Sequence, residues 1–159
     1  MKYVDTKVVF REVPDEVTLA INISNCPVHC PGCHSPYLAK DVGEILDKEA
    51  LSSLIESHPG ISCVSFMGGD AEPLTVREYA LWIKDNYKGI KTCWYSGRNL
   101  ENAGQVLDAL DFVKVGPYID EFGPLDSPGT NQRFYRIVRK EGGTPDLEDW
   151  TGRFLPRFL

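Results

Sequence analysis

Segments with strand-like spacing of hydrophobic residues alternate along the chain with segments of helical spacing. Apolar residues at alternate positions or in short runs predict strands at 17–24, 61–70, 89–97, 111–116 and 132–138. Apolar residues at helical spacing predict helices after Asp47, after Thr75 and over 101–110. Thr75 and Glu78 have the spacing of a capping box. Strands that alternate with helices favour a parallel sheet with right-handed crossovers.

Chain length limits how such a sheet can close. A complete eight-fold βα barrel needs about 250 residues, and this chain has 159. We therefore expect one domain, built as an open, partial barrel or a compact α/β sheet. Active residues of such folds collect at the carboxyl ends of the strands. Three segments of this kind follow predicted strands: a cysteine-rich loop at 24–36, a Gly-Gly-Asp turn at 67–71, and Ser96.

Composition and charge narrow the classes of function. Hydrophobic residues make up 42% and charged residues 25%, as in ordinary globular proteins. The net charge of −6 disfavours binding to nucleic acid or to anionic membranes. No apolar run approaches the roughly 20 residues that span a bilayer, and the N-terminus lacks the features of a signal peptide. We expect a cytoplasmic protein, in which thiols stay reduced.

The cysteine loop, residues 24–36, holds three of the five cysteines, Cys26, Cys30 and Cys33, at the spacing C-x3-C-x2-C. One interpretation is a structural zinc site, which needs a fourth ligand. The candidates for that ligand are His29, His34, Cys63 and Cys93. A second interpretation is ordinary buried or redox-active thiols. A third is an iron–sulfur cluster held by three thiolates, with one iron open to an external ligand.

Several segments carry a resemblance to a known family. The C-x3-C-x2-C motif after a first strand resembles the signature of the radical S-adenosylmethionine superfamily. Within it, "CPVHCPGCHSP" (26–36) is similar to the activating proteins of anaerobic ribonucleoside-triphosphate reductase, which share the histidine between the first two cysteines and the Gly-Cys pair. "MGGD" (67–70), "VGPYIDE" (115–121) and "SPGTNQRFY" (127–135) resemble later segments of that family. Gly32 replaces the aromatic residue that most superfamily members have before the third cysteine.

The resemblance implies a fold and a set of cofactors. The fold would be an open, partial βα barrel of the radical S-adenosylmethionine type, with five to six parallel strands and helices outside, in a single domain 1–159. The metal ligands of one [4Fe–4S] cluster would be Cys26, Cys30 and Cys33. The second cofactor, S-adenosylmethionine, would bind the open iron. Its contacts would come from Gly32, Cys33, His34, Gly68, Gly69, Asp70 and Ser96.

Individual roles follow from the same resemblance. Gly68 and Gly69 would let the backbone approach the methionine end, where Asp70 would accept a hydrogen bond from the ammonium. The segment 32–34 would lie against the adenine, and Ser96 would bond the ribose or the carboxylate. No catalytic side chain is expected beyond the cluster ligands.

Other residues near these motifs have simpler interpretations. His29 is a candidate for a hydrogen bond near the cluster. Lys114 could point towards the cofactor's carboxylate, although a solvated lysine at a strand end is the favoured interpretation. Cys63 and Cys93 are predicted to be core thiols.

The implied activity is that of a glycyl-radical activase. Such a protein cleaves S-adenosylmethionine reductively and takes a hydrogen atom from a glycine of the anaerobic reductase's large subunit. A low-potential donor such as flavodoxin would supply the electron, and the loop 117–131 would face the reductase. Two alternatives stay open: a small radical enzyme acting on a small molecule, similar to 7-carboxy-7-deazaguanine synthase, and a non-enzymatic zinc module that mediates protein contacts.

Overall fold

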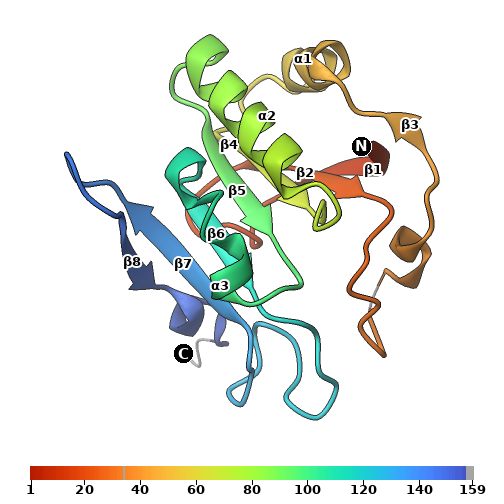
Figure 1. Cartoon of the computed structure of the whole chain (residues 1–159), viewed down its shortest axis with the longest axis vertical. Helices are drawn as coiled ribbons and strands as arrows, with labels where there is room; N and C mark the ends of the chain where they lie inside the picture. The colour runs from red at the N-terminus through yellow and green to blue at the C-terminus, as the bar shows by residue number, and fades with distance from the viewer. Residues whose placement is uncertain (34, 157–159) are drawn as a thin grey trace.

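One mixed sheet organises the molecule. The computed structural model describes residues 1–33 and 35–156, and within them eight strands lie in the order β3-β1-β2-β4-β5-β6-β7-β8 (Figure 1). The strands are β1 (Lys2–Val9), β2 (Thr18–Ile23), β3 (Glu44–Ile45), β4 (Cys63–Met67), β5 (Lys91–Tyr95), β6 (Phe112–Val115), β7 (Arg133–Val138) and β8 (Asp146–Asp149). The α-helices are α1 (Lys48–Glu56), α2 (Pro73–Asn86) and α3 (Leu100–Ala103). Short 3-10 helices are η1 (Pro36–Ala39), η2 (Leu107–Ala109) and η3 (Thr151–Phe154).

The four central strands, β2, β4, β5 and β6, are parallel to one another. At one side β1 pairs antiparallel with β2, and β3 pairs antiparallel with β1. At the other side β7 runs antiparallel to β6, and β8 antiparallel to β7. The sheet is therefore parallel in its middle and antiparallel at both margins.

The expected partial βα barrel, with five to six parallel strands and helices outside, is wrong. The described chain forms a mixed sheet of eight strands with three α-helices. A parallel neighbour needs a crossover connection, usually through a helix, whereas an antiparallel neighbour does not. The connection between β6 and β7 contains no helix, and β7 returns alongside β6 in the opposite direction.

Local sequence explains some helix boundaries but not others. The helix predicted after Asp47 is confirmed as α1, and Asp47 is its N-cap, since it accepts a hydrogen bond of 2.8 Å from the backbone nitrogen of Ala50. The capping box at Thr75 and Glu78 is wrong: α2 begins at Pro73, a residue well suited to the first helical turn. The helix expected over 101–110 is replaced by α3 and η2, two short pieces.

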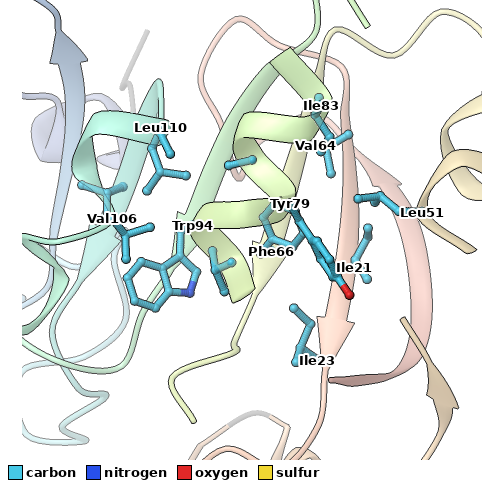
Figure 2. Packing of buried hydrophobic residues seen from close by; sticks show 14 of the residues in the cluster. Ile21, Ile23, Leu51, Val64, Phe66, Tyr79, Ile83, Trp94, Val106 and Leu110 are labelled. Atoms are coloured by element: carbon cyan, nitrogen blue, oxygen red, sulfur yellow. The ribbon is translucent and has the colours of Figure 1, made fainter. Parts of the chain in front are cut away.

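The main core lies between the helices and one face of the sheet. It includes Leu51 of α1, Tyr79 and Ile83 of α2, and strand residues such as Phe66 and Trp94. Figure 2 shows the Tyr79 ring lying beside Phe66 and Ile21, between α2 and the sheet. Burying such side chains is the main favourable contribution to the stability of the fold.

A smaller cluster covers the opposite face of the sheet. It contains Val13, Cys63, Cys93, Phe112 and Phe134, with Trp150 and Phe154 of the C-terminal segment packed against it. Since neighbouring strand residues point to opposite faces, Cys93 lies in this cluster while Trp94 lies in the main core. Among the described residues, no helix is both long enough and apolar enough to cross a bilayer.

Parallel pairing brings the ends of the four central strands together. β2, β4, β5 and β6 end at Ile23, Met67, Tyr95 and Val115, respectively. The segments that follow them therefore leave the sheet at the same edge, which we call the carboxyl edge. In Figure 1 the orange loop after β2 and the cyan loop after β6 both extend from this lower edge of the sheet.

Candidate metal centre

The three clustered cysteines leave β2 at the carboxyl edge. Backbone hydrogen bonds tie the loop down at two points: Cys26 donates to the carbonyl of Leu38 over 2.9 Å, and Cys33 to that of Cys30 over 3.2 Å. None of the three thiols is in a disulfide; Cys26 and Cys30 are half-buried and Cys33 is exposed. All three sulfurs are thus chemically free to act as ligands.

A left-handed residue precedes each of these cysteines. The φ angles are 60° at Asn25, 51° at His29 and 76° at Gly32. Only glycine adopts this conformation without cost, and asparagine tolerates it better than most residues. The backbone therefore turns sharply before every thiol. His29 adopts the left-handed conformation. The hydrogen bond predicted for its side chain near a cluster stays a prediction.

The structure gives a physical reason for glycine at position 32. Besides the positive φ, an added Cβ would lie 3.3 Å from Cε1 of Tyr118. Tyr118 belongs to the "GPY" segment just after β6. A bulky side chain at position 32 would have to displace this ring, so the contact with Tyr118 favours glycine there.

The paired glycines after β4 are required by the chain itself. At Gly68 a Cβ would lie 2.9 Å from the carbonyl oxygen of Ile23, and at Gly69 it would lie 2.9 Å from Cγ2 of Val76. Their φ angles are 112° and 95°. These glycines therefore allow the turn after β4 to pack tightly against β2 and α2. Their predicted contact with a cofactor stays a prediction.

Asp70 and Ser96 join the turns that follow β4 and β5. Asp70 is 4% exposed and accepts two hydrogen bonds, from the Ser96 hydroxyl over 2.5 Å and from the Gly97 backbone nitrogen over 3.0 Å. The Ser96 oxygen accepts in turn from the backbone nitrogen of Arg98. A carboxylate has about four acceptor sites, so Asp70 retains acceptor capacity for a further donor.

Lys114 of β6 is buried, contrary to the favoured interpretation of a solvated lysine. Its ammonium donates to the carbonyl oxygens of Ser96 and Gly116 over 3.1 and 3.0 Å. Burial lowers the pKa of Lys114 to about 8, while the negative charges of Asp70 and of the three loop thiolates act in the opposite direction. Lys114 therefore belongs to the same site.

The cysteine loop rests on the turn after β5. A Cβ added to Gly97 would lie 3.1 Å from Cγ2 of Val28, a residue between the first two cysteines. Val28 lies in the predicted cysteine loop and Gly97 ends the predicted strand 89–97, but the sequence did not predict a contact between them. Their contact couples the cysteine loop to the segment that Asp70 holds in place.

The two remaining cysteines are confirmed as core thiols. Cys63 and Cys93 are fully buried in the smaller cluster. Burial raises the pKa of Cys93 to about 12, and it also raises the pKa of Cys63. Buried thiols of this kind are poor nucleophiles and poor ligands.

A preformed site for one metal ion is absent from the described chain. Within residues 1–33 and 35–156, no group of three or more His, Cys, Asp or Glu side chains could hold such an ion. Thiolates that share one zinc lie about 2.3 Å from it, whereas thiolates on an iron–sulfur cube bind different irons and stand farther apart. The described residues thus provide no closed zinc site.

The donor set suits an iron–sulfur cluster. Thiolates are the ligands that such clusters take from proteins, and Cys26, Cys30 and Cys33 are unpaired on a sharply turned loop. Cys63 and Cys93 lie in the core and do not extend the set to four or five.

Most residues predicted for the site lie on segments that the carboxyl edge brings together. They are Cys26, Cys30, Gly32, Cys33, Gly68, Gly69, Asp70 and Ser96, on the segments that follow β2, β4 and β5. His34 lies outside the described residues. Sequence reasoning missed the burial of Lys114 and the contact of Val28 with Gly97. A lysine between two valines in a short apolar strand was the available signal for Lys114.

Comparison with known proteins agrees with this chemistry. A family model described as a 4Fe-4S single cluster domain matches residues 16–137, which is most of the chain and includes the cysteine loop, the Gly-Gly-Asp turn and Lys114. Neither the curated proteins nor the solved structures contain a match. The chain therefore belongs to the 4Fe-4S single cluster domain family and is an iron–sulfur protein.

Proposed function

We propose that this protein is a glycyl-radical activase of the radical S-adenosylmethionine type, acting on an anaerobic ribonucleoside-triphosphate reductase. The observation that carries the proposal is the joining of three motif segments at one edge. The cysteine loop, the Gly-Gly-Asp turn and Ser96 are linked through the Val28–Gly97 contact and the hydrogen bonds of Asp70. This arrangement requires only the four parallel strands and no barrel.

When bound, a reduced [4Fe–4S] cluster with an open iron would supply the electron that cleaves S-adenosylmethionine into methionine and a 5′-deoxyadenosyl radical. The chain's own residues would hold the cluster through Cys26, Cys30 and Cys33. Asp70, whose two oxygens already accept two donors, would accept a third hydrogen bond from the methionine ammonium.

The remaining cofactor contacts follow the same edge. Gly68 and Gly69 would present backbone to the methionine end. The Gly32–Cys33 segment and His34 would lie against the adenine, and Ser96, at the start of the turn after β5, would contact the ribose or the carboxylate. The electron would come from a low-potential donor such as flavodoxin.

The loop 117–131 is the proposed contact surface for the reductase. It is a defined structure: Phe122 and Gly123 both donate to the carbonyl of Ile119 over 3.0 Å, and Asn131 closes the loop by donating to the carbonyl of Pro117. Ile119 and Phe122 are nevertheless exposed. An organised loop with exposed apolar side chains beside the cysteine loop is suited to receiving another protein.

The test is an anaerobic assay with the reconstituted protein, a reductant and S-adenosylmethionine. We expect 5′-deoxyadenosine to form, and a glycyl-radical doublet to appear by electron paramagnetic resonance when the reductase is added. Formation of 5′-deoxyadenosine without a doublet would support cleavage of S-adenosylmethionine but would reject the reductase as the substrate. Release that depends on a small heterocycle instead would favour the small-molecule alternative. Zinc without iron or sulfide after anaerobic purification would reject the enzyme altogether.

A further inference from the structure

Lys114 is a buried ammonium without a carboxylate partner in the described structure. Its side chain belongs to a residue that is 8% exposed. The recorded partners of its nitrogen are the carbonyl oxygens of Ser96 and Gly116 and the face of the Tyr95 ring, 5.9 Å from the ring centroid. Among the described residues, no carboxylate oxygen lies within the 4.0 Å of an ion pair with it. Neutral acceptors alone leave a buried charge poorly compensated.

The two segments that hold this ammonium also support the cysteine loop. Ser96 precedes Gly97, which packs against Val28 of the loop. On the other side, Gly116 precedes the segment whose Tyr118 packs against Gly32. Lys114 is therefore fixed between the two points on which the cysteine loop rests, and its nitrogen has three donor hydrogens for two carbonyl acceptors.

The groups whose negative charge would act on this ammonium all belong to the site. They are Asp70 and the thiols of Cys26, Cys30 and Cys33. A cluster held by three thiolates brings negative charge to this region, and one added electron makes it more negative by one unit. A fixed positive charge nearby stabilises the more negative, reduced form.

We propose that Lys114 is the counter-charge of the cluster, held in place by Ser96 and Gly116, and that it raises the cluster's reduction potential. It is a positioning and electrostatic residue, since its recorded contacts are with the chain itself. The inference rests on the iron–sulfur cluster alone. It does not need S-adenosylmethionine or the reductase, so it can fail or hold independently of the proposed activase.

The experiment is an anaerobic redox titration of the cluster-loaded protein, without S-adenosylmethionine. Dithionite supplies one electron per cluster, and the reduced fraction is followed by electron paramagnetic resonance. We expect Lys114→Met to lower the equilibrium constant for reduction tenfold or more, which corresponds to a potential at least 59 mV more negative for a one-electron couple. Lys114→Arg, which keeps the charge, should restore most of the wild-type value.

A matched control removes a lysine far from the site. Lys88 follows α2, is exposed and donates to the carbonyl of Lys84, so Lys88→Met should leave the potential unchanged. Lys114→Gln provides a second neutral variant that can still donate hydrogen bonds. An unchanged potential in a cluster-loaded Met or Gln variant would overturn the proposal. If neither neutral variant holds a cluster, Lys114 supports the loop rather than tuning the cluster, and the proposal is equally overturned.

Discussion

The hydroxyl of Ser96 donates a hydrogen bond of 2.5 Å to Oδ1 of Asp70, and both residues are buried. This bond joins the turns after β4 and β5, two segments 26 positions apart in sequence. Gly97, the residue after Ser96, packs against Val28 of the cysteine loop. The Asp70–Ser96 hydrogen bond therefore helps to position the cysteine loop.

The Asp70–Ser96 bond should show strong energetic coupling. In a double-mutant cycle of Asp70→Ala and Ser96→Ala, we expect a coupling of about 1–3 kcal/mol, because the bond is buried and involves a carboxylate. Urea unfolding of the metal-free protein under reducing conditions measures it. The exposed Arg77–Asp108 ion pair is the control, and it should couple less because water screens it. Equal coupling in the two pairs would contradict the expectation.

Only the loop cysteines should be needed for the cluster. Cys26→Ala, Cys30→Ala and Cys33→Ala should each lose most of the iron and sulfide after anaerobic reconstitution. Cys93→Ala is the matched control: it removes a core thiol, so it should keep the cluster while lowering the free energy of unfolding by about 1 kcal/mol. Retention of a full cluster by any of the three loop variants would contradict the ligand assignment.

Thiol exposure predicts which cysteines react in the metal-free protein. Iodoacetamide should modify Cys26, Cys30 and Cys33 in the native state, because these thiols are exposed or half-buried. Cys63 and Cys93 should react only after unfolding, since burial shields them and raises their pKa. Peptide mass spectrometry before and after addition of urea measures this. Rapid native labelling of Cys93 would show that the smaller core cluster opens readily.

The contact between Gly97 and Val28 should be sensitive to one methyl group. Gly97→Ala places a Cβ 3.1 Å from Val28, so we expect a loss of about 1–3 kcal/mol in the free energy of unfolding and a smaller iron content. Gly143→Ala is the control, because nothing lies within 4 Å of its added Cβ. Calorimetry and an iron assay on both variants give the comparison. Identical behaviour of the two variants would mean that the loop does not depend on this contact.

The buried Lys114 should make the metal-free protein more stable at high pH. Its pKa is lowered by burial to about 8 from a usual value of 10.5. Between these two values the unfolded chain binds more protons than the folded one, so the free energy of unfolding rises with pH. The rise contributed by Lys114 is at most about 3 kcal/mol, at 1.36 kcal/mol per pKa unit.

Lys114→Met should lack this rise, because methionine does not titrate. Urea unfolding of both proteins at pH values from about 7.5 to 10.5 measures the difference, and titration of the other groups is common to both. Parallel curves for the two proteins would show that Lys114 is not buried as a cation in solution.

Local patterns along the chain were sufficient for much of the order of elements. The alternation in 17–24 and the apolar run from 61 predicted β2 and β4, and Asp47 marked the start of α1, because these signals depend only on neighbouring residues. The C-x3-C-x2-C spacing likewise included an iron–sulfur cluster among its three interpretations without any knowledge of the fold, and the family match supports that one.

Strand direction could not be derived in the same way. The alternation of apolar and polar residues in β7 is typical of a strand with one solvent-exposed face, and it is the same for either strand direction. Only the pairing with β6 shows that β7 runs antiparallel to it. Lys2–Val9, which the periodicity analysis did not predict, became a strand by pairing with β2. Such pairings decided the mixed sheet in place of a barrel.

The amino-acid sequence alone established that three clustered cysteines, two glycines and an aspartate follow predicted strands. Tertiary structure decided what surrounds them: a buried lysine that donates to the carbonyls of Ser96 and Gly116, a tyrosine packed against Gly32, and a valine packed against Gly97. The physical reason is that spacing along a chain fixes which residue types are neighbours in sequence. Burial, by contrast, depends on which strand ends meet, and here hydrogen bonding between distant strands determined that.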